Sequence, residues 1–315
     1  MKVLVTGGCG FIGHHLVRAW AAHHPADTVA VLDALTYAAD PARIAGLAHL
    51  VVGDVADPTA FDRAADALGG IDLVVHLAAE SHVDRSLRDP ARFVHTNVLG
   101  TQVLIDRSRA HGVARFLHVS TDEVYGSIAH GAVDESAPFR PGSPYAASKA
   151  GADHLVAAAV RSFGFPAVVA RPANVFGTGQ YPEKLLPVLA RAAVRGAPLP
   201  LYGDGLHQRD WLAVEELCSA LLCLAARAPE GSVWNLPGAG ARTNLALAEA
   251  VLAAAAAPRA LVAFVADRPG HDRRYAMTGE AAASLGIQAR TPVEVAIPAL
   301  VDEARRSLGG ASGPS

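Results

Sequence analysis

The sequence has few cysteines, few aromatic residues and no long hydrophobic run. Its three cysteines, Cys9, Cys218 and Cys223, have neither disulfide nor zinc-site spacing, and its 14 histidines show no metal-ligand spacing, so we expect no metal. No apolar run reaches the roughly 18 residues that a membrane-spanning helix needs. A strand-like segment follows directly after Met1, in place of a signal peptide. These absences predict a cytoplasmic protein that does not enter a membrane.

A strong charge of either sign is also missing. Lys and Arg number 27 against 30 Asp and Glu, which gives a formal net charge of -3 at pH 7. Because the chain has no basic field to hold a polyanion, we do not expect nucleic acid as a partner. Hydrophobic residues make up 51% of the 315 residues, enough to bury a large core in an α/β unit with or without a smaller lobe.

The N-terminal segment has the pattern of a dinucleotide-binding turn. Residues 2–6 predict a short strand, residues 14–23 predict a helix, and the turn between them has the spacing G-x-G-x-x-G. Glycines permit the tight turn and let backbone N–H groups approach a pyrophosphate, which a helix N-terminus attracts. Asp33 ends the next strand, 20 residues after Gly13, where a carboxylate can accept hydrogen bonds from adenosine ribose hydroxyls. A carboxylate there repels a 2′-phosphate, which favours NAD over NADP.

Strand-like and helix-like segments alternate through the first half of the chain. Such alternation predicts a Rossmann-type, doubly wound parallel sheet with helices on both faces. After residue 170 the composition changes to short elements separated by Gly and Pro, as in a smaller α+β substrate lobe. We predict an NAD-binding domain (1–170), a substrate-binding lobe (171–308) and a flexible tail (309–315), with part of 206–230 packing back onto the first domain. The segments are strands at 29–32, 50–54, 73–79, 115–119 and 167–170, and helices at 58–68, 90–111 and from Lys149 to about 163.

A group of proton-transfer residues follows the strand predicted for 115–119. Thr121, Asp122 and Glu123 lie at its carboxyl end, the edge at which open α/β sheets bind ligands. Tyr145 and Lys149 are four residues apart in a helix-like segment and therefore share one face. Adjacent strand residues point to opposite faces, so the chain has to bend after Thr121 for both carboxyl groups to reach one substrate. Together these groups can move protons and a hydride around a sugar.

Polar residues in several loops are further candidates. Asp54 ends its strand and either bonds an adenine amine or forms a turn. Residues 80–86 follow the fourth strand as a binding loop or an ordinary solvated loop. Residues 209–211 and 267–274 bring arginines into Gly- and Pro-rich loops, where they either bind phosphate or form surface ion pairs. Two such clusters in one lobe, opposite a dinucleotide site, favour a phosphate-bearing substrate.

Together these residues resemble the extended short-chain dehydrogenase/reductase family. The resemblance rests first on residues 6–13, on the pair Tyr145-x-x-x-Lys149 and on Asn97. Within that family the chain is most similar to the dTDP-glucose 4,6-dehydratases, whose motifs span nearly its whole length in the expected order. These motifs are residues 32–38, 76–86, 119–126, 143–149, 182–187, 201–205 and 267–275.

The resemblance implies NAD as cofactor and an NDP-glucose, dTDP-glucose before others, as substrate. In the implied reaction the sugar is oxidised at C4, water is eliminated across C5 and C6, and the hydride returns to C6. Tyr145 removes the C4 hydroxyl proton, its pKa lowered by Lys149 and the nicotinamide ring, while Thr121 bonds the same oxygen. Glu123 removes the C5 proton and Asp122 protonates the leaving hydroxyl, so the pKa values of the two carboxyls have to differ.

The resemblance also assigns the remaining contacts. It implies a homodimer formed through the helix at 90–111 and the helix after Tyr145. The predicted cofactor-binding residues are Gly7, Gly10, Phe11, Ile12, Gly13, Asp33, Leu35, Thr36, Asp54, Val55, Leu77, Ala78, Ala79, Thr96, Tyr145, Lys149 and Asn174. The predicted substrate-binding residues are Ser81, His82, Asp84, Thr121, Asn174, Lys184, Leu185, Pro200, Tyr202, Arg209, Asn235, Arg268 and His271.

Other readings of the chain stay open because it departs from the family after Asn174. Val175 and Phe176 stand where the family has asparagine and tyrosine, and residues 177–180 also differ. A UDP-sugar 5,6-dehydratase would keep the same Thr-Asp-Glu triplet. A 4-epimerase or decarboxylase is a second alternative, although an epimerase needs no acid and base at C5 and C6. A non-catalytic NAD-binding protein is a third, against which the intact catalytic residues argue.

Overall fold

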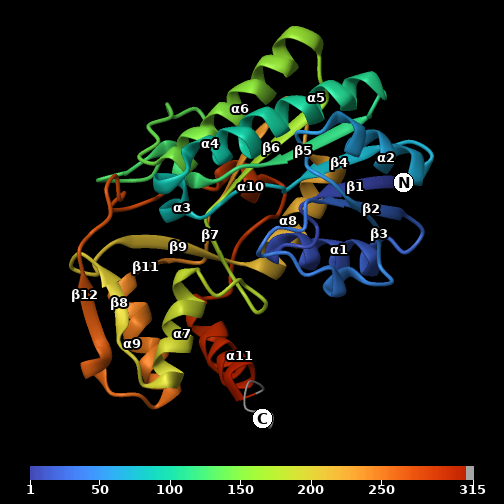
Figure 1. The fold of residues 1–315 in the computed structure, drawn as a ribbon. Helices are drawn as coiled ribbons and strands as arrows, with labels where there is room; N and C mark the ends of the chain where they lie inside the picture. Colours follow the sequence, from blue (N-terminus) through green and yellow to red (C-terminus); the bar gives the residue numbers. More distant parts are fainter. Residues whose placement is uncertain (310–315) are drawn as a thin grey trace.

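The computed structural model describes residues 1–309, which form a large parallel sheet covered by helices and a smaller lobe beside it (Figure 1). Every neighbouring pair in the sheet is parallel, and the strand order reverses next to β1, where doubly wound sheets bind ligands. The predicted Rossmann-type fold is confirmed. Across the sheet the strands are β3 (His49–Val52), β2 (Thr28–Asp33), β1 (Lys2–Thr6), β4 (Leu73–His76), β5 (Arg115–Val119), β6 (Ala167–Pro172) and β10 (Val233–Leu236).

One face of the sheet is covered by α1 (Phe11–His23) and α8 (Val214–Arg227), which pack against each other. Val3 and Val5 of β1 join this core, together with the fully buried Trp20 of α1. The intervening residue of β1 points the other way, because successive strand side chains alternate between faces.

The opposite face carries α2 (Pro58–Leu68), α5 (Gly100–Ala110) and α6 (Pro144–Phe163), seen along the upper side of Figure 1. Leu4 of β1 lies in this second core with Phe61 of α2. Because each central strand is buried on both sides, its sequence is continuously apolar and not alternating. That pattern is what predicted these strands correctly.

The polar segment 80–86 is only partly a loop. Helix α3 (Val83–Arg88) begins inside it, because His82 caps the helix: its imidazole accepts a hydrogen bond from the Arg85 backbone N–H at 3.3 Å. Asp84 lies in the first turn, where the helix dipole favours a negative charge. The loop prediction is therefore wrong for the second half of this segment.

The helix predicted for residues 90–111 is interrupted. It consists of α4 (Pro90–Phe93), a π-helical turn (Val94–Leu99) and then α5. The π-helical turn contains the buried Asn97, whose side-chain amide donates to the Ser148 hydroxyl of α6 at 2.8 Å. Single π-helical turns often occur at functional sites, and this one faces the pocket described below.

The smaller lobe has its own apolar core, formed by three helices and two small sheets. One sheet holds three strands and the other two. The lobe elements are β7 (Asn174–Phe176), β9 (Gln208–Ala213), β11 (Ala241–Thr243), β8 (Leu199–Tyr202), β12 (Val262–Val265), α7 (Leu185–Arg195), α9 (Asn244–Ala255) and α11 (Ile297–Gly309). Short elements are α10 (Glu280–Ser284) and the 3-10 turns Pro41–Ile44, Asp122–Tyr125, Arg259–Leu261 and Val293–Ala296.

The chain crosses between the two units more than once. Helix α8, which lies within residues 206–230, packs on α1, and β10 then extends the large sheet beside β6. That return of β10 was not predicted from the sequence. Within residues 1–309, no helix is long and apolar enough to cross a membrane. The predicted tail lies outside the described residues from position 310 onward.

Candidate active site

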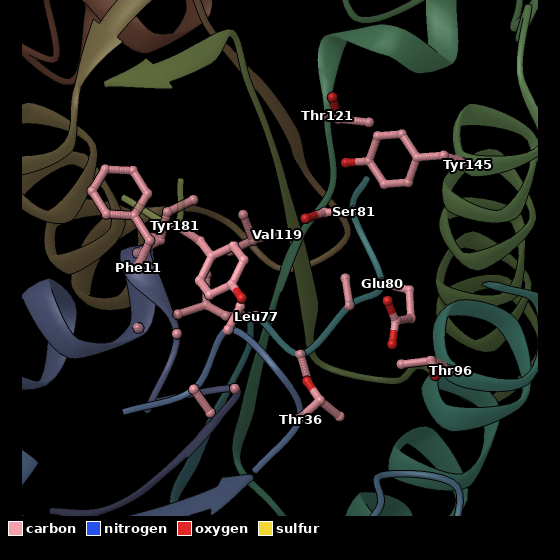
Figure 2. Close-up of a pocket in the computed structure, with 18 of the residues that line it drawn as sticks. Phe11, Thr36, Leu77, Glu80, Ser81, Thr96, Val119, Thr121, Tyr145 and Tyr181 are labelled. Carbon is pink, nitrogen blue, oxygen red and sulfur yellow. The ribbon is translucent and has the colours of Figure 1, made fainter. Parts of the chain in front are cut away.

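A pocket of about 510 Å³ opens at the carboxyl ends of the central strands. It is lined by the glycine turn before α1, by the ends of β2, β4 and β5, and by the start of α6. In Figure 2, Phe11 and Tyr181 lie on one side of this pocket and the Tyr145 ring lies on the other, near Thr121. The pocket therefore joins the predicted cofactor residues to the predicted catalytic residues.

The glycine turn brings backbone atoms close together where a side chain would not fit. Gly7 has a φ of 70°, and a Cβ there would lie 2.8 Å from the Ala78 backbone. A Cβ on Gly13 would lie 2.1 Å from the carbonyl oxygen of Gly7. Helix α1 begins at this point and directs its free N–H groups toward the pocket. This cradle fits the pyrophosphate of a dinucleotide.

Asp33 is held in place by the backbone around it. Its two carboxylate oxygens accept hydrogen bonds from the N–H groups of Cys9 and Leu35, each at 2.9 Å. Leu35 adopts a positive φ of 50°, which folds the chain after β2 so that its amide reaches the carboxylate. The side chain of Asp33 is largely buried and lines the pocket. The carboxylate is thus fixed where the ribose hydroxyls of NAD are expected.

Most other predicted cofactor residues also line the pocket. Asp54 does so while its carboxylate pairs with His95 at 3.1 Å. Of the predicted cofactor residues, only Leu35 does not line the pocket. Its backbone N–H instead donates to Asp33. The others at the pocket wall are Gly10, Phe11, Ile12, Thr36, Val55, Leu77, Ala78, Ala79, Thr96 and Asn174.

The chain bends after Thr121, as is needed for both carboxyl groups to reach one substrate. The 3-10 turn Asp122–Tyr125 starts there, capped by the Thr121 hydroxyl, which accepts from the Glu123 N–H at 3.3 Å. The bend directs Asp122 and Glu123 into the same pocket. Across it, Tyr145 projects from the first turn of α6, which Ser143 caps. Strand end, turn and helix thus gather the predicted catalytic residues.

The two adjacent carboxyl groups have different surroundings. Burial, followed by the neighbouring Glu123, raises the pKa of Asp122 to about 8. Burial also raises the pKa of Glu123, but the cations Arg209, Arg268 and Lys184 oppose that shift. At neutral pH this arrangement favours a protonated Asp122, while the three cations favour the charged form of Glu123. The two carboxyls thus differ in the way that the predicted acid and base require.

The phenol and the ammonium group lie on one face of α6. Lys149 donates from Nζ to the carbonyl oxygen of Val119 at 2.8 Å. Burial lowers the pKa of Lys149 to about 8, and the carboxylate of Asp153 opposes that shift. Burial and then Glu123 raise the pKa of Tyr145 above its usual range. The protein alone thus shifts the Tyr145 pKa in the direction opposite to the one predicted.

The arginines of the substrate lobe are held by internal partners. The Arg209 guanidinium donates to the carbonyl oxygens of Gln208 (2.8 Å) and Asp272 (2.9 Å) and lies 4.2 Å from the centre of the Tyr275 ring. Arg268 pairs with Asp84 at 3.2 Å across the two units. These partners fix the cations beside the catalytic carboxyls without removing their charge.

Several predicted substrate residues do not line the pocket. Asn235 is fully buried and accepts a hydrogen bond from the Tyr125 hydroxyl at 2.7 Å, inside a network with Arg171. Pro200 is exposed on β8. Of the substrate set, Ser81, Thr121, Asn174 and Lys184 are at the pocket wall. Those elsewhere are His82, Asp84, Leu185, Pro200, Tyr202, Arg209, Asn235, Arg268 and His271.

His207, Asp267 and His271 form a cluster with metal-ligand atoms within 4.8 Å of one another. The two imidazole rings stack at 3.7 Å with an interplanar angle of 12°. Parallel stacked rings hold their nitrogen lone pairs in two separate planes, whereas the ligands of one ion have to converge on it. Asp267 instead pairs with both histidines, at 3.2 and 2.6 Å. The cluster therefore orders the loop after β12.

Several pocket residues were not predicted from the sequence, among them four polar residues that lie on two segments. Tyr37, Gln180, Tyr181 and Glu183 all line the cavity. Tyr37 and Glu183 lie inside two of the family motifs, so the resemblance could have identified them. Gln180 and Tyr181 lie outside those motifs.

Comparison with known proteins adds to this geometry. Residues 3–236 match the NAD dependent epimerase/dehydratase family. The chain belongs to this family. A dTDP-glucose 4,6-dehydratase from Streptomyces niveus is 44% identical over 88% of this chain and 84% of its own. The resemblance found in the sequence is thus confirmed.

Solved structures of family members superpose closely on this chain. DesIV, a dTDP-glucose 4,6-dehydratase from Streptomyces venezuelae solved with NAD and TYD bound, has a TM-score of 0.93 and 40% identity, covering 98% of each chain. The UDP-glucose 4-epimerase of Thermus thermophilus in complex with NAD has a TM-score of 0.90 and 30% identity, over 97% of this chain and 99% of its own. NAD as the cofactor of this enzyme is likewise confirmed.

Proposed function

We propose that this protein is a nucleotide-sugar 4,6-dehydratase that converts dTDP-glucose to its 4-keto-6-deoxy product. The observation that carries the proposal is the adjacent carboxyls Asp122 and Glu123, with different electrostatic surroundings, opposite Tyr145 and Lys149 in one pocket. Curated relatives of the same name and the fit of the glycine turn to a dinucleotide support it.

The oxidative half of the reaction is assigned to Tyr145, Thr121 and Lys149. When bound, NAD would supply hydride transfer, first from C4 and finally to C6. Tyr145 takes the proton of the C4 hydroxyl, and Thr121 bonds the same oxygen. Because burial and then Glu123 raise the pKa of Tyr145, its ionisation would depend on the positive charges of Lys149 and the cofactor ring. Lys149, buried near the start of α6, would also hold the cofactor ribose.

The elimination half is assigned to the adjacent carboxyls. A ketone at C4 acidifies the C5 proton, which the ionised Glu123 removes. Asp122, protonated at neutral pH because of its burial, gives its proton to the departing C6 hydroxyl, so water leaves. In the last step Glu123 returns the proton to C5. The pair regenerates its starting protonation states once Asp122 is reprotonated from solvent.

The substrate lobe is assigned to the nucleotide diphosphate. Arg209 and Arg268 lie close enough to Glu123 to influence its pKa, so their cations lie on the sugar side of the pocket. Residues 171–308 would form this lobe, apart from α8 and β10, which belong to the sheet unit. Lys184 and Asn174, at the pocket wall, would contact the sugar.

The same proposal includes a cytoplasmic homodimer. Helices α5 and α6 pack side by side on the outer face of the sheet unit (Figure 1). Leu99, at the end of the π-helical turn before α5, is 47% exposed, and Phe163, at the end of α6, is 58% exposed. A second copy of this face would cover both. Light scattering of the purified protein should give twice the chain mass; a single-chain mass at micromolar concentration would remove this part of the proposal.

Product analysis tests the function. Purified enzyme is incubated separately with dTDP-, UDP-, GDP- and CDP-glucose, and products are measured by mass and proton NMR. We expect loss of one water and a C6 methyl signal, with dTDP-glucose the best substrate. A product of unchanged mass would instead establish an epimerase, and an alkene signal would establish a 5,6-dehydratase, which the altered residues Val175 and Phe176 leave open.

A further inference from the structure

Residues 177–184, here called the strap, join β7 to α7 and cross the edge of the pocket. Four of them, Gln180, Tyr181, Glu183 and Lys184, contribute to the pocket wall. Gly177 and Gly179 have φ angles of 155° and 79°, and a Cβ on Gly177 would lie 2.6 Å from the Val214 side chain. These positions let the chain leave β7 and turn over the cavity.

The first half of the strap is fastened to the sheet unit and to α11. Arg43 donates to the carbonyl oxygen of Gly179 at 2.6 Å, and His15 Nε2 lies 3.0 Å from the carbonyl oxygen of Thr178. The Gly179 N–H donates to Glu303 at 3.0 Å. The carbonyl oxygen and the N–H group of Gly179 are therefore both fixed by side chains that are distant in the sequence.

The second half is fastened through Glu183. One of its carboxylate oxygens accepts from the Tyr37 hydroxyl at 2.7 Å, and the other lies 3.1 Å from Arg85. The Arg85 guanidinium also lies 3.6 Å from the centre of the Tyr37 ring, so the three side chains contact one another. The Glu183 side chain is only 13% exposed, although Arg85 is 44% exposed. This contact joins three chain segments that are distant from one another in sequence.

The partners of the strap come from segments that also carry cofactor residues. Tyr37 follows Thr36 in the pocket wall, and its ring meets the Tyr181 ring edge-on at 5.2 Å. Lys184 donates to the backbone carbonyl of Ser81 at 2.8 Å, just after Ala79. The strap thus crosses from one side of the cofactor end to the other and is fastened on both.

We propose that Glu183, through Tyr37 and Arg85, holds the strap closed over the dinucleotide and keeps NAD bound throughout turnover. The inference rests on the proposed function, in which the hydride taken at C4 must return to C6 of the same sugar. The reaction as a whole oxidises nothing, so the enzyme does not need to release its cofactor. Loss of the reduced cofactor before the hydride returns to C6 would leave an unfinished keto sugar. Glu183 is a positioning residue, since it acts on the strap and not on the reacting atoms.

The test measures cofactor dissociation without any sugar. Holoenzyme loaded with radiolabelled NAD is chased with unlabelled NAD, and retained label is followed on filters for wild type, Glu183→Gln and Tyr37→Phe. We expect dissociation to be about tenfold faster in Glu183→Gln, the change expected on losing a charge-assisted contact, and a smaller acceleration in Tyr37→Phe. Glu249→Gln, which breaks the α9 ion pair with Arg259, is the matched control and should leave the rate unchanged.

A second measurement separates retention from general damage. Glu183→Gln passed through gel filtration should lose NAD and turnover together, and added NAD should restore turnover. If Glu183→Gln and Tyr37→Phe both release NAD at the wild-type rate, the proposal is overturned. A turnover defect in Glu183→Gln that added NAD does not rescue would overturn it as well. If wild type acts on no nucleotide sugar while the variants still release NAD faster, the proposed function fails and retention by the strap stands.

Discussion

At the cofactor end of the site the wall is mainly backbone, whereas at the sugar end it is mainly buried ionisable side chains. Gly7 and Gly13 exclude any side chain from the turn, and Asp33 is fixed by two backbone amides. At the sugar end, burial raises the pKa values of Asp122 and Glu123. One end therefore recognises a fixed shape, while the other holds groups whose protonation can change during the reaction.

The difference also lies in what stabilises each end. Removing a glycine from the turn creates a steric clash that no rearrangement of a flexible side chain relieves. Removing a cation such as Arg268 leaves Asp84 without its ion-pair partner, although the Tyr202 hydroxyl still bonds it, and does not block the pocket. Substitutions should accordingly separate into those that affect NAD and those that affect the sugar, with Tyr145 between the two ends affecting the chemistry of both.

The largest expected effect is that of Tyr145→Phe. The variant keeps the ring but loses the group that takes the C4 proton, so the first oxidation should slow by about a hundred- to ten-thousand-fold. Single-turnover absorbance of reduced nicotinamide after mixing with dTDP-glucose measures it, and retained NAD is the control. A near-normal rate of oxidation in Tyr145→Phe would show that another residue acts as the base.

Glu123→Gln should fail at a later step. Oxidation at C4 does not use Glu123, so bound nicotinamide should still become reduced, while exchange of the C5 proton with deuterated solvent should fall by about a hundredfold or more. Proton NMR of recovered sugar follows the exchange. Full turnover by this variant would contradict the assignment of separate oxidation and elimination groups.

Gly13→Ala should act on the cofactor end alone. The new Cβ would lie 2.1 Å from the Gly7 carbonyl oxygen, so NAD affinity should fall by about ten- to a hundredfold. Calorimetric titration of NAD-free protein measures the affinity. Gly151→Ala in α6, whose Cβ would meet only the Val98 side chain at 3.4 Å, should bind NAD like wild type. Equal NAD affinities of Gly13→Ala and Gly151→Ala would contradict a cofactor end whose shape is fixed by backbone.

Arg268→Gln should act on the sugar end. Losing a charged contact to diphosphate should raise KM for dTDP-glucose by about tenfold or more, with NAD affinity unchanged. Steady-state kinetics with saturating NAD measures KM. Arg259→Gln, at an ion pair on the exposed surface of the lobe, provides the control. An unchanged KM would remove Arg268 from the substrate site.

The smallest expected effect is a pH dependence at the alkaline side. Asp122 acts as an acid, so kcat/KM should fall as pH rises through about 8, where its carboxyl loses the proton. Lys149 has its pKa near the same value, so its ionisation contributes to the same limb. Asp122→Asn should lose the part of the limb seen in the loss of water but keep the part seen in C4 oxidation. A flat profile in wild type would contradict a protonated Asp122.

Local patterns predicted the cofactor end and the order of the catalytic residues. The glycine turn, Asp33 and the pair Tyr145 and Lys149 each lie within a few residues of a strand or helix that the apolar pattern identifies. Short-range physics suffices for such features because their geometry depends on one turn of chain. The bend after Thr121 was only a condition of the catalytic hypothesis, and the sequence itself does not show it.

The sugar end and the strap could not be predicted in the same way. Tyr37 and Glu183 are 146 positions apart in sequence, and nothing local in either segment indicates the other. Asn235 looked like a ligand residue but hydrogen-bonds Tyr125 in the core, because β10 returns to the large sheet. The raised pKa of Tyr145 depends on burial among distant segments. Tertiary packing decides these features, and they cannot be predicted from composition or from the spacing of residues.

Transfer of a label within one sugar tests the central claim most directly. dTDP-glucose carrying deuterium at C4 is converted by wild-type enzyme in ordinary water, and the product is examined by deuterium NMR. If Tyr145 serves the oxidation while Asp122 and Glu123 serve the elimination, the deuterium should appear in the C6 methyl group of a 4-keto product. Deuterium kept at C4 of a sugar of unchanged mass, or lost from the product, would contradict the account.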